Sequence, residues 1–205
     1  MNKQNGFTLV EIAIVMVIIG LLLGGVLKGQ EIVTNAKIKN LENDFSGVTA
    51  AIYSYQDRYR ALPGDDGRAE KRFETAKSTG EPGNGNIEGV FDSITEKEES
   101  RLLWAHLRSA GLVDGEAGTS DLPVNSFSGV TGVSSEQVLN IAEGRTYIGF
   151  SKIPNNIAII LESRSDDEKP DSGSIRADKT GAGTTEDTDG YYGDDEVIRN
   201  MYFIL

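Results

Sequence analysis

The chain has 205 residues, enough for one globular domain and one appended element, and its formal net charge is −12. This acidity argues against nucleic acid as a general partner and against attraction to anionic lipid head groups, so any membrane contact must come from apolar burial. The sequence contains no cysteine, which excludes disulfides and thiolate metal sites.

The first predicted element is an apolar helix close to the N-terminus. Residues 12–27 contain no charged or strongly polar side chain. Together with residues 7–11 they would form a helix of about 31 Å, long enough to span a bilayer core. No A-x-A pattern follows Leu27, and a polar helical pattern continues from Lys28. We therefore expect the segment to be retained in the mature protein rather than removed as a secretory signal.

A single carboxylate, Glu11, lies within this apolar segment. An ionisable side chain in the middle of a membrane costs about 2.5–3.5 kcal/mol, and the cost is lower near the end of the span, where Glu11 lies. Residues of this kind usually have a specific partner. The alternative interpretation is a signal anchor whose glutamate merely lies at the membrane interface.

The stretch KQNGFTLVEIAIVMVIIG, residues 3–20, resembles the N-terminus of type IV prepilins and of type II secretion pseudopilins. It has a short leader, MNKQNG, that ends in Gly6, followed by Phe7 and then by Glu11 as the fifth residue after that glycine. The resemblance implies cleavage between Gly6 and Phe7 by a membrane-embedded prepilin peptidase, and N-methylation of Phe7. It also implies a single-pass, N-in precursor in the bacterial inner membrane that later polymerises.

Cleavage would create a partner for Glu11, namely the new α-amino group of Phe7 on a neighbouring subunit. Such a pair would set the axial register of a helical filament, as a buried polar residue does in a coiled coil. The resemblance implies further partners: identical or related pilin subunits, a prepilin peptidase and methyltransferase, an assembly platform and an ATPase motor. The assembled filament would be an extracellular pilus or a periplasmic pseudopilus.

The glycines of the apolar segment allow two interpretations. Small residues let helices approach closely, which favours packing between subunits. Glycine also weakens a helix, and the resemblance implies that the segment from Gly20 to Gly25 could instead lose helicity in a filament, although it contains no proline. The residues concerned are Gly20, Gly24, Gly25 and Gly29.

Apolar residues spaced alternately by three and four continue the helix to Tyr59, and Pro63 and Gly64 mark its end. This stripe predicts a helix face that packs on a C-terminal sheet, with a free coiled coil as the alternative. The stripe consists of Ile38, Leu41, Phe45, Val48, Ile52, Tyr55 and Tyr59.

The remaining sequence predicts one short helix and a modest antiparallel sheet. The helix is expected from Thr95 to Ala110, with Thr95 and Glu98 as a capping box and Gly111 at its end. Strands are expected at Tyr147–Ile153, Ile157–Ser163 and Val197–Leu205. The fold class is therefore α+β, and the resemblance of the N-terminus implies a pilin-like fold. We expect a leader at 1–6, a long helix at about 7–59 with 7–27 as the transmembrane or filament-core part, and a globular domain at 60–205.

Two acidic, glycine-containing stretches are candidate calcium sites, because a hard cation needs several oxygen ligands. The first combines Asp65 and Asp66 with Asn84 and Asn86. The second is the stretch 186–196, and neither has the spacing of an EF-hand loop. The alternative for both is turn chemistry on a solvated acidic face. The candidate ligands in the second stretch are Asp187, Asp189, Asp194 and Asp195.

No motif predicts an enzyme. His106 is the single histidine and lies among tryptophan and leucine, which favours a packed or surface residue over a catalytic base. No phosphate-binding loop spacing is present. The resemblance of the N-terminus implies a structural pilin subunit, with a pseudopilin of type II secretion as the first alternative. A membrane-tethered, non-polymerising binding module is the second.

Overall fold

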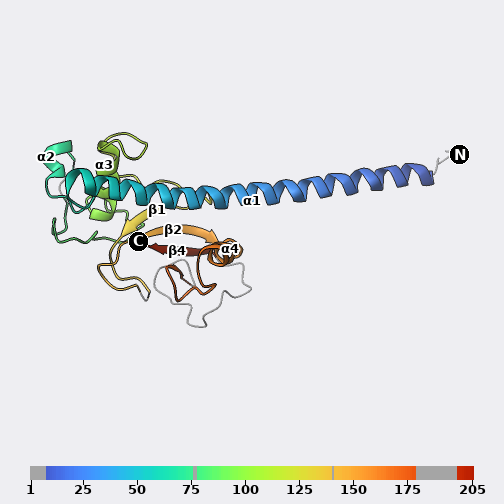
Figure 1. Ribbon diagram of the computed structural model, residues 1–205. Helices are drawn as coiled ribbons and strands as arrows, with labels where there is room; N and C mark the ends of the chain where they lie inside the picture. The colour runs from blue at the N-terminus through green and yellow to red at the C-terminus, as the bar shows by residue number, and fades with distance from the viewer. Residues whose placement is uncertain (1–7, 76–77, 140, 179–197) are drawn as a thin grey trace. The chain divides into compact units, whose positions relative to one another are not determined.

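The computed structural model describes residues 8–75, 78–139, 141–178 and 198–205. They fall into two compact units, residues 1–39 and residues 40–205, and the long helix α1 (Leu9–Tyr59) has residues in both. The remaining elements, labelled where space allows in Figure 1, belong to the second unit: α2 (Ala69–Phe73), α3 (Glu99–Ser109), β1 (Thr131–Ser134), β2 (Tyr147–Pro154), α4 (Asn155–Ser165), β3 (Ile175–Ala177) and β4 (Ile198–Ile204).

The long helix ends where the sequence predicts. Tyr59 is its last residue, and Arg60 takes a left-handed conformation with φ 54° while its N–H still bonds to the carbonyl of Gln56 at 2.8 Å. Pro63 follows shortly and cannot continue a helix. In the second unit the predicted stripe is buried at Leu41, Val48, Ile52 and Tyr55, which confirms that this face packs against the domain.

The four strands form one antiparallel sheet in the order β1-β2-β4-β3. Thr131 of β1 pairs with Phe150 of β2, Phe150 pairs with Met201 of β4, and Ile175 of β3 pairs with Phe203 of β4. The predicted α+β class with an antiparallel sheet is therefore confirmed. β2 and β4 lie at the positions expected for the first and third strands, except that Val197 falls outside the described residues.

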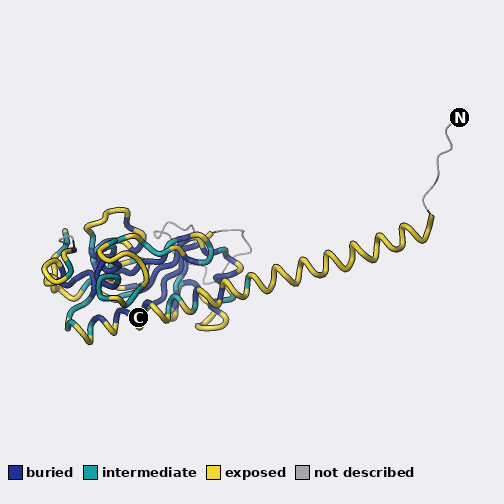
Figure 2. Tube along the Cα trace, turned by 90° about the horizontal axis from the view of Figure 1, so that it is seen from above, coloured by how far each residue is buried: buried dark blue, intermediate teal, exposed yellow. Residues whose placement is uncertain are grey.

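Both faces of the sheet are covered, so its central strands do not alternate between apolar and polar residues. On one face Phe203 packs against Phe150 and against Phe45 of α1, with ring centroids 5.3 and 5.2 Å apart. On the other face Tyr202 lies edge to face with Tyr147 and with Phe91, at 5.5 and 5.6 Å. Figure 2 shows the resulting buried core of the second unit in dark blue.

Two predicted elements need correction. The segment expected as a strand at Ile157–Ser163 belongs to α4, because its buried residues recur with helical spacing at Ile157, Ala158, Leu161 and Glu162. A short apolar run of β-branched residues does not distinguish a strand from a helix, and the predicted strand is wrong. The segment also follows Pro154, which occupies the N-cap position in an extended conformation.

The expected start of α3 is also wrong. The helix begins at Glu99 rather than Thr95, and no side chain caps it. Residues 95–98 form a separate turn, in which the N–H of Glu98 bonds to the carbonyl of Thr95 at 3.1 Å. The predicted end is confirmed: Gly111 has φ +69°, and the N–H of Leu112 returns to the carbonyl of Leu107, as in a Schellman motif.

A buried polar clamp fixes the start of β4. The guanidinium of Arg199 donates to Asn155 Oδ1 at 2.5 Å and to the carbonyl of Asp178 at 2.9 Å. The N–H of Asn200 donates to Asp178 Oδ1 at 2.9 Å, and Asp178 is fully buried. The chain has no disulfides, and these bonds connect the first residue of α4, the residue after β3 and the start of β4.

Candidate functional site

The N-terminal end of α1 carries a reciprocal hydrogen-bond arrangement. Thr8 precedes the first helical residue, Leu9, and its backbone N–H and its hydroxyl each donate to Glu11 Oε2 at 2.7 Å. The N–H of Glu11 in turn donates to Thr8 Oγ1 at 3.3 Å. This is a capping box, which satisfies N–H groups that have no partner within the helix.

The capping box changes the interpretation of Glu11. Its carboxylate is not an isolated charge, because it caps its own helix and lies in the first turn, where the helix dipole favours an anion. The pattern T-x-x-E before an apolar run was visible in the sequence at Thr8 but was not used. The capping box predicted at Thr95 is wrong, because α3 begins at Glu99 and has no side-chain cap.

Both hydrogen bonds from Thr8 end on the same carboxylate oxygen, Oε2. Within the part of the chain from Thr8 onward that the structure describes, no hydrogen bond to Oε1 is present. Gly6 and Phe7 lie outside the described residues. Cleavage between them, methylation of Phe7 and the pairing of Phe7 with Glu11 therefore stay predictions.

The first unit exposes a continuous apolar surface. Its large apolar side chains between Leu9 and Leu27 are from 45% exposed at Ile19 to 86% exposed at Leu9. Figure 2 shows this part of α1 as exposed along its whole length. By length and composition α1 is able to cross a membrane. An apolar surface of this extent is not stable in water, so lipid or other protein must cover it.

The helix is continuous through its glycines. An added methyl group at Gly20, Gly24, Gly25 or Gly29 would have no atom within 4 Å, so nothing in the single chain requires glycine there. Each glycine weakens the helix by roughly 1 kcal/mol relative to alanine. Close packing against other helices and melting within a filament both stay open as reasons for this cost.

The residues of the first predicted calcium site make separate contacts with protein groups. Asp65 accepts backbone N–H groups of the loop 83–85, including that of Gly85 at 2.7 Å and that of Asn84 at 3.2 Å. Asp66 instead accepts from Tyr55 Oη at 2.8 Å and pairs with Arg72 at 2.5 Å. The two neighbouring carboxylates therefore bind different protein donors. Turn chemistry accounts for the contacts of Asp65, and calcium binding by this stretch stays a prediction.

The same holds for the amides of that predicted site. Asn84 Oδ1 accepts the N–H of Asn86, and Asn84 Nδ2 donates to Glu88, both at 2.8 Å. The second predicted calcium site, Asp187, Asp189, Asp194 and Asp195, lies outside the described residues, and calcium binding there stays a prediction.

His106 is a packed residue, as expected. It is only 2% exposed, its ring stacks on Tyr55 with an interplanar angle of 15°, and its Nδ1 accepts the N–H of Gly64 at 3.0 Å. Burial lowers the pKa of His106 to about 4, although the charge of Asp66 acts in the opposite direction. The imidazole is therefore neutral at pH 7, with its proton on Nε2.

Comparison with known proteins supports the interpretation of the N-terminus. The family described as the prokaryotic N-terminal methylation motif matches residues 1–27. No curated protein matches the sequence. The structure is similar to that of the major type IV pilin PilA1 from Clostridium difficile, with a TM-score of 0.40 and 10% sequence identity over 83% of this chain and 95% of that chain.

At this TM-score the structural likeness is loose and supports no conclusion about this chain. The motif covers residues 1–7, the capping box at Thr8 and Glu11 and the exposed apolar part of α1. A long N-terminal helix followed by an antiparallel sheet completes the arrangement. The chain therefore carries the prokaryotic N-terminal methylation motif at the start of a long, exposed apolar helix.

Proposed function

We propose that the chain is a structural pilin subunit that polymerises into a type IV pilus-like filament after removal of residues 1–6 and methylation of Phe7. The observation that carries this proposal is the exposed apolar surface of α1 between Leu9 and Leu27, which needs a cover. Lipid supplies that cover in a membrane-anchored precursor. In a filament, the same segments of other subunits would replace the lipid, so apolar burial is retained during assembly.

Glu11 would act twice in this scheme. In the single chain its Oε2 caps α1 through Thr8. In the filament its charge would pair with the α-amino group of Phe7 on a neighbouring subunit and so define the axial register. A charged pair in apolar surroundings is very sensitive to the loss of one partner, because the other is then left buried and uncompensated.

The two roles can be separated by two substitutions. Glu11→Gln keeps a side chain that can complete a capping box but removes the charge. Thr8→Ala removes the cap and keeps the charge, and it costs about 1 kcal/mol of helix stability. We expect Glu11→Gln to be processed and membrane-inserted but to form no filaments, whereas Thr8→Ala should still assemble.

Electron microscopy of sheared cell-surface filaments measures assembly, and mass spectrometry of the same material measures processing. The mature wild-type chain should begin at Phe7 and carry one extra methyl group, and Gly6→Leu should leave the precursor uncleaved. Wild-type filament levels in Glu11→Gln would refute the register role. A wild-type mass that corresponds to residues 1–205 without a methyl group would refute the processing.

The pseudopilin of type II secretion is the alternative within the same class, and it differs in where the polymer lies. A pilus subunit is recovered by shearing from the outside of the cell, and a pseudopilin stays in the periplasm. A non-polymerising binding module would show the mature N-terminus in the membrane fraction with no polymer in either place. The pilin assignment is structural rather than enzymatic, and the one histidine is occupied in packing.

A further inference from the structure

The loop between α2 and α3 carries an asparagine followed by a glycine, Asn84 and Gly85. Both residues are exposed, and Gly85 has a positive φ of +87°. Glycine has no side chain, so nothing attached to Gly85 shields its backbone nitrogen from the neighbouring side-chain amide. This nitrogen and the amide carbon Cγ of Asn84 are the two atoms that would join in a five-membered succinimide ring.

Each group that would take part in this ring closure has a polar partner of the kind that the reaction needs. The N–H of Gly85, the nucleophile, donates to Asp65 Oδ2 at 2.7 Å. Asn84 Oδ1 accepts the N–H of Asn86, and Asn84 Nδ2, the leaving group, donates to Glu88 Oε1, both at 2.8 Å. A base, an oxyanion donor and a carboxylate beside the leaving amine are therefore all within hydrogen-bond reach.

Both carboxylates are held in place by other contacts. Asp65 is buried and also accepts the backbone N–H of Asn84 at 3.2 Å. The main chain of Glu88 is bonded to the start of α3. Its N–H donates to Glu99 Oε2 at 3.1 Å, and its carbonyl accepts the N–H of Ser100 at 3.0 Å. The partners of the asparagine side chain are therefore arranged before any reaction begins.

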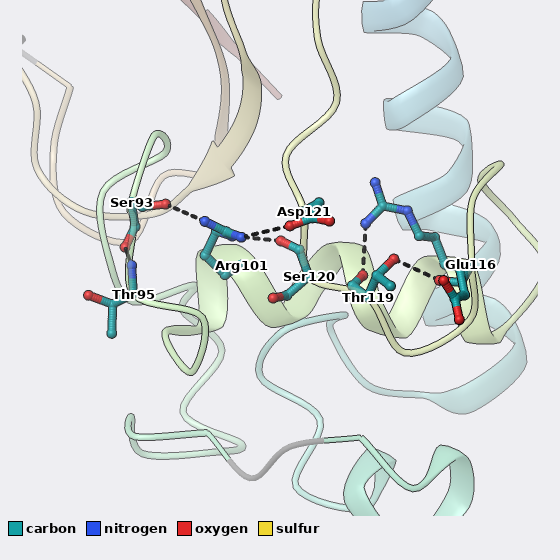
Figure 3. A network of polar contacts seen from close by, with 8 residues as sticks. Ser93, Thr95, Arg101, Glu116, Thr119, Ser120 and Asp121 are labelled. Atoms are coloured by element: carbon teal, nitrogen blue, oxygen red, sulfur yellow. Dashed lines mark hydrogen bonds and ion pairs between the residues drawn. The ribbon is translucent and has the colours of Figure 1, made fainter.

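The start of α3 is itself anchored by Arg101. Figure 3 shows the side chain of Arg101 between the segments that precede and follow the helix. It donates to the carbonyl of Ser93 at 2.9 Å and to the carbonyl of Ser120 at 2.6 Å. Because these bonds tie α3 to both segments, the helix gives Glu88 a fixed support. Groups positioned in this way lose little entropy when a reaction takes place.

We propose that Asn84 is a site of self-catalysed deamidation. The Gly85 nitrogen attacks Cγ of Asn84 while its proton passes to Asp65 Oδ2, and the new N–Cγ bond closes the ring. The N–H of Asn86 stabilises the negative charge that develops on Oδ1. The Cγ–Nδ2 bond then breaks, the proton returns from Asp65 through solvent to Nδ2, and ammonia leaves; the charge of Glu88 favours protonation of that nitrogen. Water then opens the succinimide to aspartate or isoaspartate.

The product changes the contacts of the loop. A side-chain amide that donates to Glu88 becomes a carboxylate beside it, so repulsion between like charges replaces a hydrogen bond. Isoaspartate also inserts a side-chain carbon into the main chain and shifts the residues that follow. Ring closure depends neither on cleavage after Gly6 nor on polymerisation, so this inference is independent of the proposed filament role.

The test follows the full-length protein in non-ionic detergent and mildly alkaline buffer by peptide mapping with mass spectrometry. The fragment that contains Asn84 should lose the mass of ammonia and then gain the mass of water. The reference is a synthetic peptide of residues 81–90, which contains Glu88 but lacks Asp65 and the fold. Conversion in the folded protein should be at least about tenfold faster than in this peptide, because only the protein positions the base.

Two variants and one internal control make the result specific. Glu88→Gln should slow conversion about fivefold, because a charge-assisted hydrogen bond becomes a neutral one. Glu81→Gln changes the same charge in the same loop and should convert at the wild-type rate. Glu81 is exposed, and within the described ranges no hydrogen bond or ion pair joins it to Asn84. Asn125 should stay an amide, because its Nδ2 donates to the carbonyl of Ser151 at 2.8 Å rather than to a carboxylate.

Two outcomes would overturn the proposal. One is a rate in the folded protein at or below that of the peptide, including no conversion at all, which would show that the hydrogen bonds protect Asn84 instead of activating it. The other is an equal rate in the wild type and in Glu88→Gln, which would show that the carboxylate beside the leaving amine plays no part.

Discussion

His106 makes the stability of the globular unit depend on pH in a predictable direction. Its pKa is about 4 in the folded protein, against 6.5 for an unperturbed histidine. Between these values the unfolded chain binds a proton that the folded chain does not, so the free energy of unfolding falls as the pH falls. Protonation would also remove the acceptor of the Gly64 N–H, because Nδ1 would itself become a donor.

The size of the effect follows from the difference between the two pKa values. Each unit corresponds to about 1.36 kcal/mol, so the full difference is worth about 3 kcal/mol. Most of this loss, about 2 kcal/mol, is expected by about pH 5, and nearly all of it by about pH 4. Above pH 7 the contribution of His106 no longer changes, because both states are then neutral.

The assay is urea unfolding of the full-length chain in non-ionic detergent, followed by Trp104 fluorescence between pH 7 and pH 4. Carboxylates also titrate in this range, so the informative quantity is the difference between the wild type and His106→Asn. Asparagine can place an oxygen near the position of Nδ1 and does not titrate, so it should lose about 3 kcal/mol less than the wild type on acidification. Parallel pH profiles for the two proteins would refute the reasoning.

Two further predictions concern buried polar anchors in the same unit. Arg199→Ala should lower the free energy of unfolding by about 3 kcal/mol, because it leaves the buried acceptors on Asn155 and Asp178 without their donor; urea unfolding measures this, and a loss below about 1 kcal/mol would contradict it. Asp65→Ala should release the loop 83–85, whose N–H groups it binds, and limited proteolysis should then cut there first. Unchanged cleavage sites and rates would show that the loop is held by other contacts.

Local patterns in the sequence were enough to predict the N-terminal helix and the residue at which it ends. These patterns are an apolar run of membrane length, its continuation as an amphipathic stripe and the helix-breaking residues Pro63 and Gly64. Each pattern depends only on residues close together in the sequence, so α1 ends at Tyr59 as predicted. The motif around Gly6, Phe7 and Glu11 is equally local, and its match to a known family covers only residues 1–27. The helical periodicity predicts that Leu41 and Tyr55 are buried, and this prediction does not depend on which residues cover them.

The tertiary structure decided the elements and sites whose signals are short or whose partners are distant in sequence. Residues 157–163 have apolar content that suits either a strand or a helix, and only their packing against the sheet selects α4. Asp65 and Asp66 are adjacent, yet one binds the loop 83–85 and the other binds Tyr55 and Arg72, which no spacing rule reveals. Arg199 and Asn155 meet in a hydrogen bond although they are 44 positions apart, because hydrogen bonds and burial depend on distance in space, which the order of residues alone does not contain.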